Sequence, residues 1–97
     1  MKSPKECITI DEVRNCIDTI DEQIIKLLAL RFNYVKATVP FKDKTEAGII
    51  AQERKDAVLK SRRLLAEEQG LNPNIIEDIY KKLIQYFIEE EMRIINK

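Results

Sequence analysis

The sequence predicts an all-α fold, in which a chain of three helices with a long first helix forms an intertwined homodimeric helical bundle. Apolar residues recur three and four positions apart over three long segments, which is the spacing of one face of a helix. Glycine or proline stands at the breaks between these segments, and no strand pattern or internal repeat interrupts them. The first segment is also so long that the rest of its own chain cannot cover its whole apolar face.

The first helix is predicted to begin at Thr9 or Asp11 and to end or kink at Pro40. Threonine and aspartate are both common N-cap residues, and proline cannot donate the helical hydrogen bond. The apolar stripe consists of Ile10, Val13, Ile17, Ile20, Ile24, Leu27, Leu28, Val35 and Thr38. A helix of about 30 residues is roughly 45 Å long, whereas a compact domain of this size has a radius of gyration of about 13 Å. We therefore expect a second copy of the chain to cover the remaining stripe.

The rest of the chain is predicted to form a loop and two further helices. Residues 41 to about 50 contain a glycine and mixed charges without a clear period, which indicates a loop. The second helix runs from about residue 51 to Gln69, and Gly70 ends it as a C-terminal cap. Asn72 caps the third helix, Pro73 occupies its first position, and the helix continues to near Asn96.

Composition limits the class of protein. The chain has 97 residues, of which 44% are hydrophobic and 35% charged, so we expect one globular domain over residues 1–97. Lysine plus arginine and aspartate plus glutamate number 17 each, which argues against a nucleic-acid partner. Because no apolar run is long enough for a membrane span or an export signal, we expect no membrane association and a cytoplasmic location.

The residue types that are missing restrict the chemistry. Without histidine the chain cannot build a serine or cysteine nucleophile system of the usual kind or the common zinc sites, and two glycines cannot make a glycine-rich phosphate loop. Cys7 and Cys16 do not have metal-ligand spacing and are expected to be reduced thiols with a structural role or none. We expect no metal and no cofactor. The chemistry must rest on arginine, lysine, glutamate and glutamine.

Two charged residues lie within apolar helical stripes. The neighbours of Arg31 three and four positions away are Leu27, Leu28, Tyr34 and Val35. Those of Glu91 are Phe87, Ile88, Ile94 and Ile95. Either the two charges form a buried ion pair that sets helix register, or both face a polar cavity that binds a ligand. Two other cations are expected to be surface residues when they are considered by themselves. They are Arg14, which has Asp11 and Asp18 beside it, and Lys42, which lies just beyond Pro40.

One stretch resembles a known family. The segment "VRNCIDTIDEQIIKLLALRFNYVKATVPFK", residues 13–42, is similar to the first helix of the all-helical chorismate mutases. The chain most resembles the isochorismate-pyruvate lyase branch of salicylate-siderophore biosynthesis, through M-K-x-P-x-x-C at residues 1–7, "YVKA" at 34–37, "FK" at 41–42, "ER" at 53–54 and "AEEQGL" at 66–71. The likeness spans nearly the whole chain, with about one extra residue before Glu53.

This resemblance implies the type II chorismate mutase fold, a homodimer with two equivalent sites, and a small dianionic substrate, isochorismate or chorismate. It implies that Arg14 binds one substrate carboxylate from the partner chain and that Arg31 binds the other. Lys42 would approach the ether oxygen and a carboxylate, and Glu53 would contact the ring hydroxyl. Glu91 stands where many members have a glutamine that donates to the ether region. The implied catalytic residues are thus Lys42 and Glu91.

Two positions depart from the mutase pattern. Gln52 stands where bacterial mutases often have a further cation, which favours the lyase branch. Glu91 can donate a hydrogen bond only when protonated, which should make activity pH-dependent. The resemblance therefore predicts an isochorismate-pyruvate lyase with chorismate mutase activity. The alternatives are a dedicated chorismate mutase of aromatic amino-acid biosynthesis and, more remotely, a non-catalytic dimerisation module.

Overall fold

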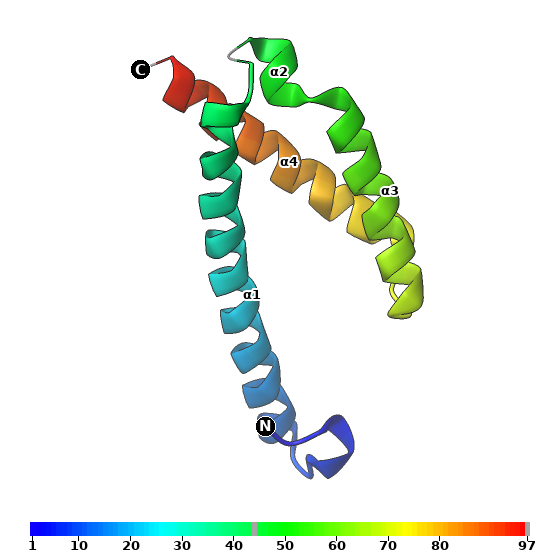
Figure 1. Cartoon of the computed structure of the whole chain (residues 1–97). Helices are drawn as coiled ribbons and strands as arrows, with labels where there is room; N and C mark the ends of the chain where they lie inside the picture. The colour runs from blue at the N-terminus through cyan, green and yellow to red at the C-terminus, as the bar shows by residue number, and fades with distance from the viewer. Residues whose placement is uncertain (44, 97) are drawn as a thin grey trace. The chain divides into compact units, whose positions relative to one another are not determined.

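The computed structural model describes residues 1–43 and 45–96, and every regular element in these ranges is a helix (Figure 1). In chain order they are η1 (Pro4–Glu6), α1 (Ile10–Thr38), η2 (Val39–Phe41), α2 (Glu46–Ile50), α3 (Gln52–Glu68) and α4 (Pro73–Ile95). The all-α prediction is confirmed. The chain divides into two compact units, Met1–Tyr34 and Val35–Lys97, which are described separately.

In the first unit, α1 begins where the sequence predicts. Thr9 Oγ1 accepts a hydrogen bond from the Glu12 backbone N–H at 3.2 Å, and Glu12 Oε2 accepts one from the Ile8 N–H at 2.9 Å. Together they form a variant of the capping box, which satisfies backbone donors that a helix start leaves unpaired. The 29-residue helix ends at Thr38, two residues before Pro40, as predicted.

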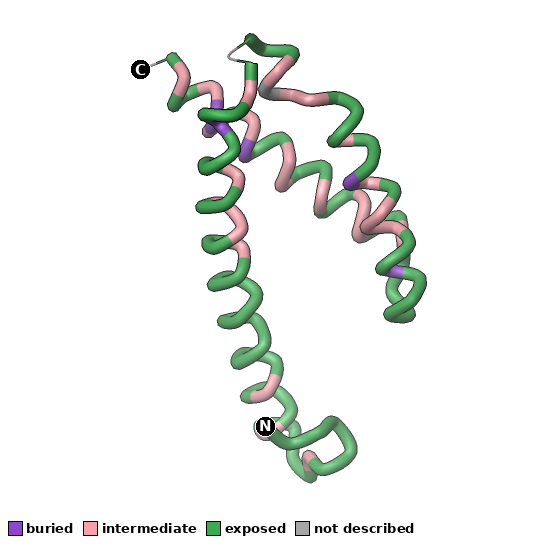
Figure 2. The backbone as a smooth tube through the Cα atoms, viewed as in Figure 1, coloured by how far each residue is buried: buried purple, intermediate pink, exposed green. Residues whose placement is uncertain are grey.

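The apolar stripe of α1 is open to solvent in the single chain. No residue of α1 is buried, and Figure 2 shows this helix only in the colours of exposed and intermediate residues. Leu27 is 62% exposed and Ile17 is 50% exposed. The other large apolar side chains exposed on α1 are Ile10, Val13, Ile20, Ile24, Ile25, Leu30 and Tyr34. A row of this length is unusual on a monomeric soluble protein.

In the second unit, the break between α3 and α4 follows the predicted chemistry. Gly70 has φ of 72°, the Gly70 N–H donates to the Glu67 carbonyl at 3.1 Å, and the Leu71 N–H donates to the Ala66 carbonyl at 2.8 Å. This pair of bonds is a Schellman motif, in which glycine takes the left-handed position at little steric cost. Asn72 then caps α4, because its Oδ1 accepts from the Asn74 N–H at 2.8 Å.

The predicted loop over residues 41–50 is wrong in part, because η2 and the short helix α2 form there. Thr45 caps α2 by accepting from the Gly48 N–H at 3.1 Å. Ala51 has φ of 46° in the left-handed region, which separates α2 from α3. A helix of five residues depends on such caps more than on apolar periodicity, so the sequence pattern did not indicate it.

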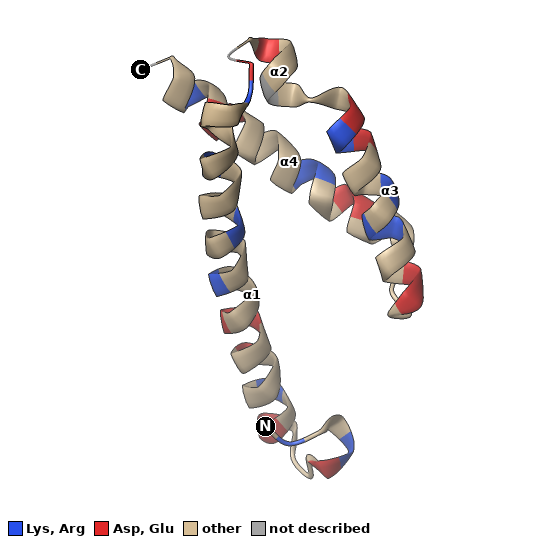
Figure 3. Ribbon diagram, in the orientation of Figure 1, with Lys and Arg blue, Asp and Glu red and all other residues tan. Residues whose placement is uncertain are grey.

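The helices α3 and α4 run alongside each other in the second unit, and their contacts hold α4 in place (Figure 1). Val58 and Ala66 of α3 and Phe87 of α4 are buried. Between the same two helices, the Arg62 guanidinium of α3 lies 5.5 Å from the centre of the Tyr80 ring of α4, a cation–π distance. Figure 3 shows that charges of both signs are interspersed along α3, as on a solvated face. This packing positions the second half of α4, which carries Glu91.

Among the described residues, no helix combines the length and the apolar character that crossing a bilayer requires.

Candidate functional site

A partly buried ion pair joins two of the sequence-predicted site residues in the second unit. Lys42 follows η2, where its backbone N–H donates to the Val39 carbonyl at 3.2 Å and fixes the start of the loop. Glu91 lies one helical turn after the buried Phe87 on α4. Lys42 Nζ donates to Glu91 Oε2 at 2.9 Å, and the exposed fractions of the two side chains are 24% for Lys42 and 3% for Glu91. The structure therefore brings together residues that are 49 positions apart in sequence.

The geometry of this pair makes Lys42 the donor and Glu91 the acceptor of one hydrogen bond. A carboxylate removed from water is costly unless it is paired and hydrogen-bonded, and a lysine ammonium is a donor that makes both interactions at once. Glu91 is thus an acceptor in the ligand-free protein. The Lys42 side chain keeps some exposure, so an anionic ligand that reached the pair would meet an ammonium group. Glu91 thus holds the positive charge of Lys42 at a fixed place beside α4.

The two arginines belong to the first unit, where both are carried by α1. Arg14 is exposed and Arg31 is half-buried. They are 17 positions apart on one continuous helix, which corresponds to about 26 Å along its axis. Two side chains at that separation cannot hold one small molecule between them. The remaining predicted residue, Glu53, is exposed in the first turn of α3.

A pocket of about 490 Å³ lies in the second unit between α2, the start of α3 and one face of α4. It is lined by Glu46, Ile50, Gln52, Lys55, Gln85, Ile88, Glu89 and Met92. A dianion would meet two carboxylates and a single cation there, so this charge pattern suits such a substrate poorly. No residue pattern in the sequence indicated this pocket, although Gln85, Ile88 and Met92 share one face of α4 by their spacing.

The chain matches a family of known enzymes over residues 13–92, the family described as chorismate mutase type II. The match covers most of the chain and includes every candidate site residue. The chain belongs to the chorismate mutase type II family. The family resemblance seen in the sequence is thereby confirmed.

Individual relatives of this chorismate mutase type II chain fall into two groups. The chain is 39% identical over 93 residues to isochorismate pyruvate lyase from Pseudomonas aeruginosa, an alignment that covers 96% of this chain and 91% of that protein. It is 33% identical over 76 residues to the T-protein of Haemophilus influenzae and over 73 residues to that of Enterobacter agglomerans. These alignments cover 78% and 75% of this chain but 20% of each T-protein.

Residue patterns alone did not predict the direct contact between Lys42 and Glu91, although the family resemblance placed both residues near the ether oxygen. These patterns singled out Glu91 because of its apolar neighbours, but indicated Lys42 by itself as a surface residue of a loop. No local pattern could have paired them, because the loop that carries Lys42 and the helix that carries Glu91 come together only through tertiary packing. The alternative of an Arg31–Glu91 pair stays a prediction, since these residues belong to different units.

Proposed function

We propose that this protein is an isochorismate-pyruvate lyase, which converts isochorismate to salicylate and pyruvate, with chorismate mutase activity as a second reaction of the same site. The observation that carries the proposal is the likeness to isochorismate pyruvate lyase along 96% of the chain at 39% identity. The match to the chorismate mutase type II family over residues 13–92 supports mutase activity as the companion reaction.

The residues suit a pericyclic reaction. Such a step needs no nucleophile, and catalysis consists of holding the substrate in a compact conformer and stabilising charge that grows on the ether oxygen. Arg14 and Arg31 are proposed to bind the two carboxylates, because a planar guanidinium can bind a carboxylate through two hydrogen bonds. Lys42 is proposed to act at the ether oxygen, and Glu53 at the ring hydroxyl.

The proposed active assembly is an intertwined homodimer. Arg14 and Arg31 of one chain lie about 26 Å apart along α1, so one small substrate can be held by both only if one arginine comes from another chain. The exposed apolar stripe of α1 supports the same conclusion, because a second copy would cover it. In this assembly the Arg14 of each chain completes the site of its partner.

Glu91 is proposed to have two states. In the ligand-free protein it is the carboxylate partner of Lys42 at 2.9 Å. A carboxylate this close to the ether oxygen would repel a dianionic substrate, whereas the protonated acid can donate a hydrogen bond to the oxygen. We therefore expect activity to depend on the protonation of Glu91.

The test is a comparison of kcat/KM for isochorismate and chorismate with the purified protein. We expect turnover of both, with the higher value for isochorismate. Turnover of chorismate alone would make the protein a dedicated mutase, and turnover of neither would support a non-catalytic dimerisation module.

A matched pair of variants tests the site itself. Arg31→Ala should abolish activity with little loss of helix content, because it removes a carboxylate-binding group. Lys26→Ala is the control, since Lys26 is an exposed cation on the same helix that pairs with Glu22 at 2.9 Å. If Arg31→Ala keeps activity within about tenfold of the parent, which is about 1.4 kcal/mol, Arg31 does not bind the substrate.

A further inference from the structure

Gly48, in the middle of α2, lies directly against the main chain of Asp43. A Cβ added at Gly48 would overlap the Asp43 carbonyl oxygen, and it would lie 2.8 Å from the Asp43 Cβ and 3.0 Å from the Asp43 carbonyl carbon. Carbon atoms that are not bonded to each other prefer separations of roughly 3.5 to 4.0 Å. Because the carbonyl group belongs to the main chain, no side-chain rotation can make room. The contact therefore fits glycine and excludes every residue that has a Cβ.

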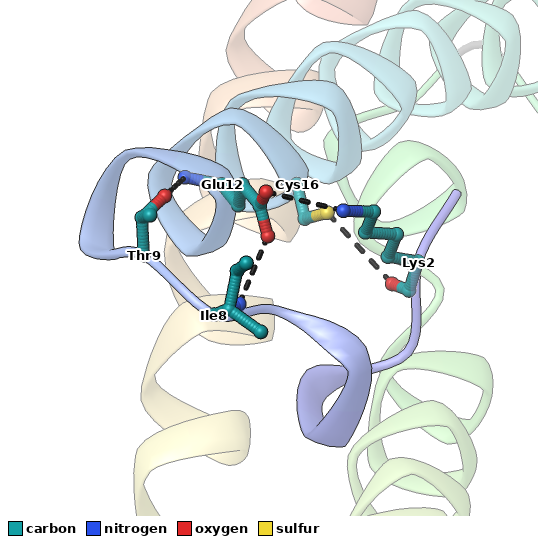
Figure 4. Close-up of polar contacts among 5 residues, drawn as sticks. All are labelled: Lys2, Ile8, Thr9, Glu12 and Cys16. Carbon is teal, nitrogen blue, oxygen red and sulfur yellow. Dashed lines mark hydrogen bonds and ion pairs between the residues drawn. The ribbon is translucent and has the colours of Figure 1, made fainter.

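The backbone of α2 does not itself require glycine at this position. Gly48 is not at a positive φ, and glycine within a helix is less favourable than alanine. Thr45 caps α2 by accepting from the Gly48 N–H at 3.1 Å. Thr9 caps α1 in the same way, by accepting from the Glu12 N–H at 3.2 Å (Figure 4). Glutamate is accommodated at that third position of α1, so the feature that distinguishes α2 is the close approach of Asp43.

Asp43 transmits this contact to Lys42, the residue before it. The Lys42 N–H donates to the Val39 carbonyl at 3.2 Å, and the Lys42 Nζ donates to Glu91 Oε2 at 2.9 Å. Consecutive α-carbons are about 3.8 Å apart across a planar peptide bond, so a displaced Asp43 main chain displaces Lys42 as well. The place of the ammonium group beside Glu91 thus depends on where Asp43 lies.

Steric pressure at Gly48 would move Asp43 rather than α2. The α2 helix contacts α4, and its end is fixed because the Ala51 N–H donates to the Ala47 carbonyl at 2.9 Å. Asp43 is exposed and lies between η2 and α2, so it has solvent to move into. An added methyl group would therefore displace the segment that carries Lys42.

We propose that Gly48 is a positioning residue for the proposed reaction. Its missing side chain lets Asp43 lie against α2, and this contact sets the place of the Lys42 ammonium group relative to Glu91 and to the ether oxygen of the substrate. The link to the substrate rests on the proposed function, whereas the link to Glu91 is a property of the ligand-free protein. Gly48 itself touches no reacting atom and acts through Asp43 and Lys42.

The first experiment compares Gly48→Ala with Gly70→Ala in steady-state turnover of isochorismate and chorismate. Gly70→Ala is the matched control, because it makes the same change where an added Cβ has no atom within 4 Å. Gly48→Ala should lower kcat by about 10- to 100-fold with a smaller change in KM, the scale of a catalytic group misplaced by roughly 1 Å. Gly70→Ala should keep the kcat of the parent. If helix propensity alone governs position 48, Gly48→Ala will be at least as stable and as active as the parent, which would overturn the proposal.

The second experiment needs no turnover and measures whether Lys42 stays beside Glu91. The coupling between these two residues is obtained from denaturant unfolding of Lys42→Ala, Glu91→Gln and the double variant, first in the parent and then with Gly48→Ala added to each protein. We expect a smaller coupling in the proteins that carry Gly48→Ala. An unchanged coupling would show that position 48 does not place Lys42, and would overturn the proposal. If the parent turns over neither substrate, the proposed function fails, and this coupling still decides the role of Gly48.

A compensating substitution covers the case in which Gly48→Ala fails to fold. Asp43→Gly removes the Asp43 Cβ and lets the carbonyl group there rotate away from α2, because glycine adopts more backbone conformations. The double variant Gly48→Ala with Asp43→Gly should therefore fold, and it should recover most of the kcat and of the Lys42–Glu91 coupling that Gly48→Ala loses. Helix content by circular dichroism checks the folding. A double variant that is no better than Gly48→Ala would mean that Asp43 is not the obstacle, and the proposal would then be wrong.

Discussion

At the scale of single residues, the Lys42–Glu91 pair is the feature of the described chain that most constrains the chemistry. The Glu91 carboxylate, which is 3% exposed, pairs with the Lys42 ammonium group, so burying this carboxylate would be costly without Lys42. The pair therefore stabilises the ligand-free protein. In the proposed function, the same two residues also take part in catalysis. The two roles can be separated, because stability and activity respond differently to the same substitutions.

Lys42→Ala should reduce the free energy of unfolding by about 3 kcal/mol, the scale of a buried charge that has lost its partner. The double variant Lys42→Ala with Glu91→Gln should recover most of this loss, because a neutral amide is less costly to bury. Denaturant unfolding of the parent, both single variants and the double variant measures the coupling. Additive effects would show that the pair contributes nothing to stability.

Lys42→Ala and the double variant should both have kcat lower by on the order of 10² to 10³, because both lack the donor.

Glu91→Gln should flatten the pH dependence of activity. In the parent, only the protonated form of the Glu91 side chain can donate a hydrogen bond to the ether oxygen, so the rate should depend on pH. Glutamine donates at every pH, so the variant should hold or raise the rate near neutral pH. The measurement is kcat/KM of both proteins from about pH 5 to about pH 8. A flat parent profile, or an inactive variant across the range, would remove Glu91 from the donor position.

At the scale of helices and turns, a feature could be predicted from the sequence when the residues that form it are close together in the chain. The ends of α1, α3 and α4 could be predicted because Thr9, Gly70 and Asn72 act on backbone groups within a few residues. The short helix α2 was missed because five residues carry no periodic signal and depend on the Thr45 cap. Local patterns could not predict the Lys42–Glu91 contact, because the two residues are 49 positions apart, and only the family resemblance placed both near the ether oxygen. Interactions between nearby residues thus predict the helices and their ends. The contact within the candidate site depends on tertiary structure.

Gly70→Ala should reduce the free energy of unfolding by about 1 to 2 kcal/mol, the cost of a left-handed conformation for a residue with a Cβ. An added Cβ would have no atom within 4 Å, so the loss should be purely conformational. Gly70→Asn should cost less, because asparagine tolerates this region. Denaturant unfolding at one fixed protein concentration compares the three proteins. Equal losses for alanine and asparagine would mean that backbone conformation does not set the cost.

At the scale of the whole molecule, the proposed dimer predicts two properties that can be measured separately. The chain should sediment as a dimer at micromolar concentration, because a single copy leaves the apolar stripe of α1 in water. Each site should also combine Arg31 of one chain with Arg14 of the other. The second claim is the stronger, since a dimer could form through the same stripe without sharing its sites.

Mixing two inactive variants tests shared sites directly. Arg14→Ala and Arg31→Ala homodimers should each be inactive, because every site lacks one arginine. When equal amounts are unfolded and refolded together, about half of the dimers should contain one chain of each kind. In such a dimer one site combines the intact Arg31 and the intact Arg14 and is complete, whereas the other site lacks both. The refolded mixture should therefore recover about a quarter of the parent activity, measured as kcat against total sites. If both arginines act within their own chain, no combination of these variants contains a complete site, and the refolded mixture should stay as inactive as its components.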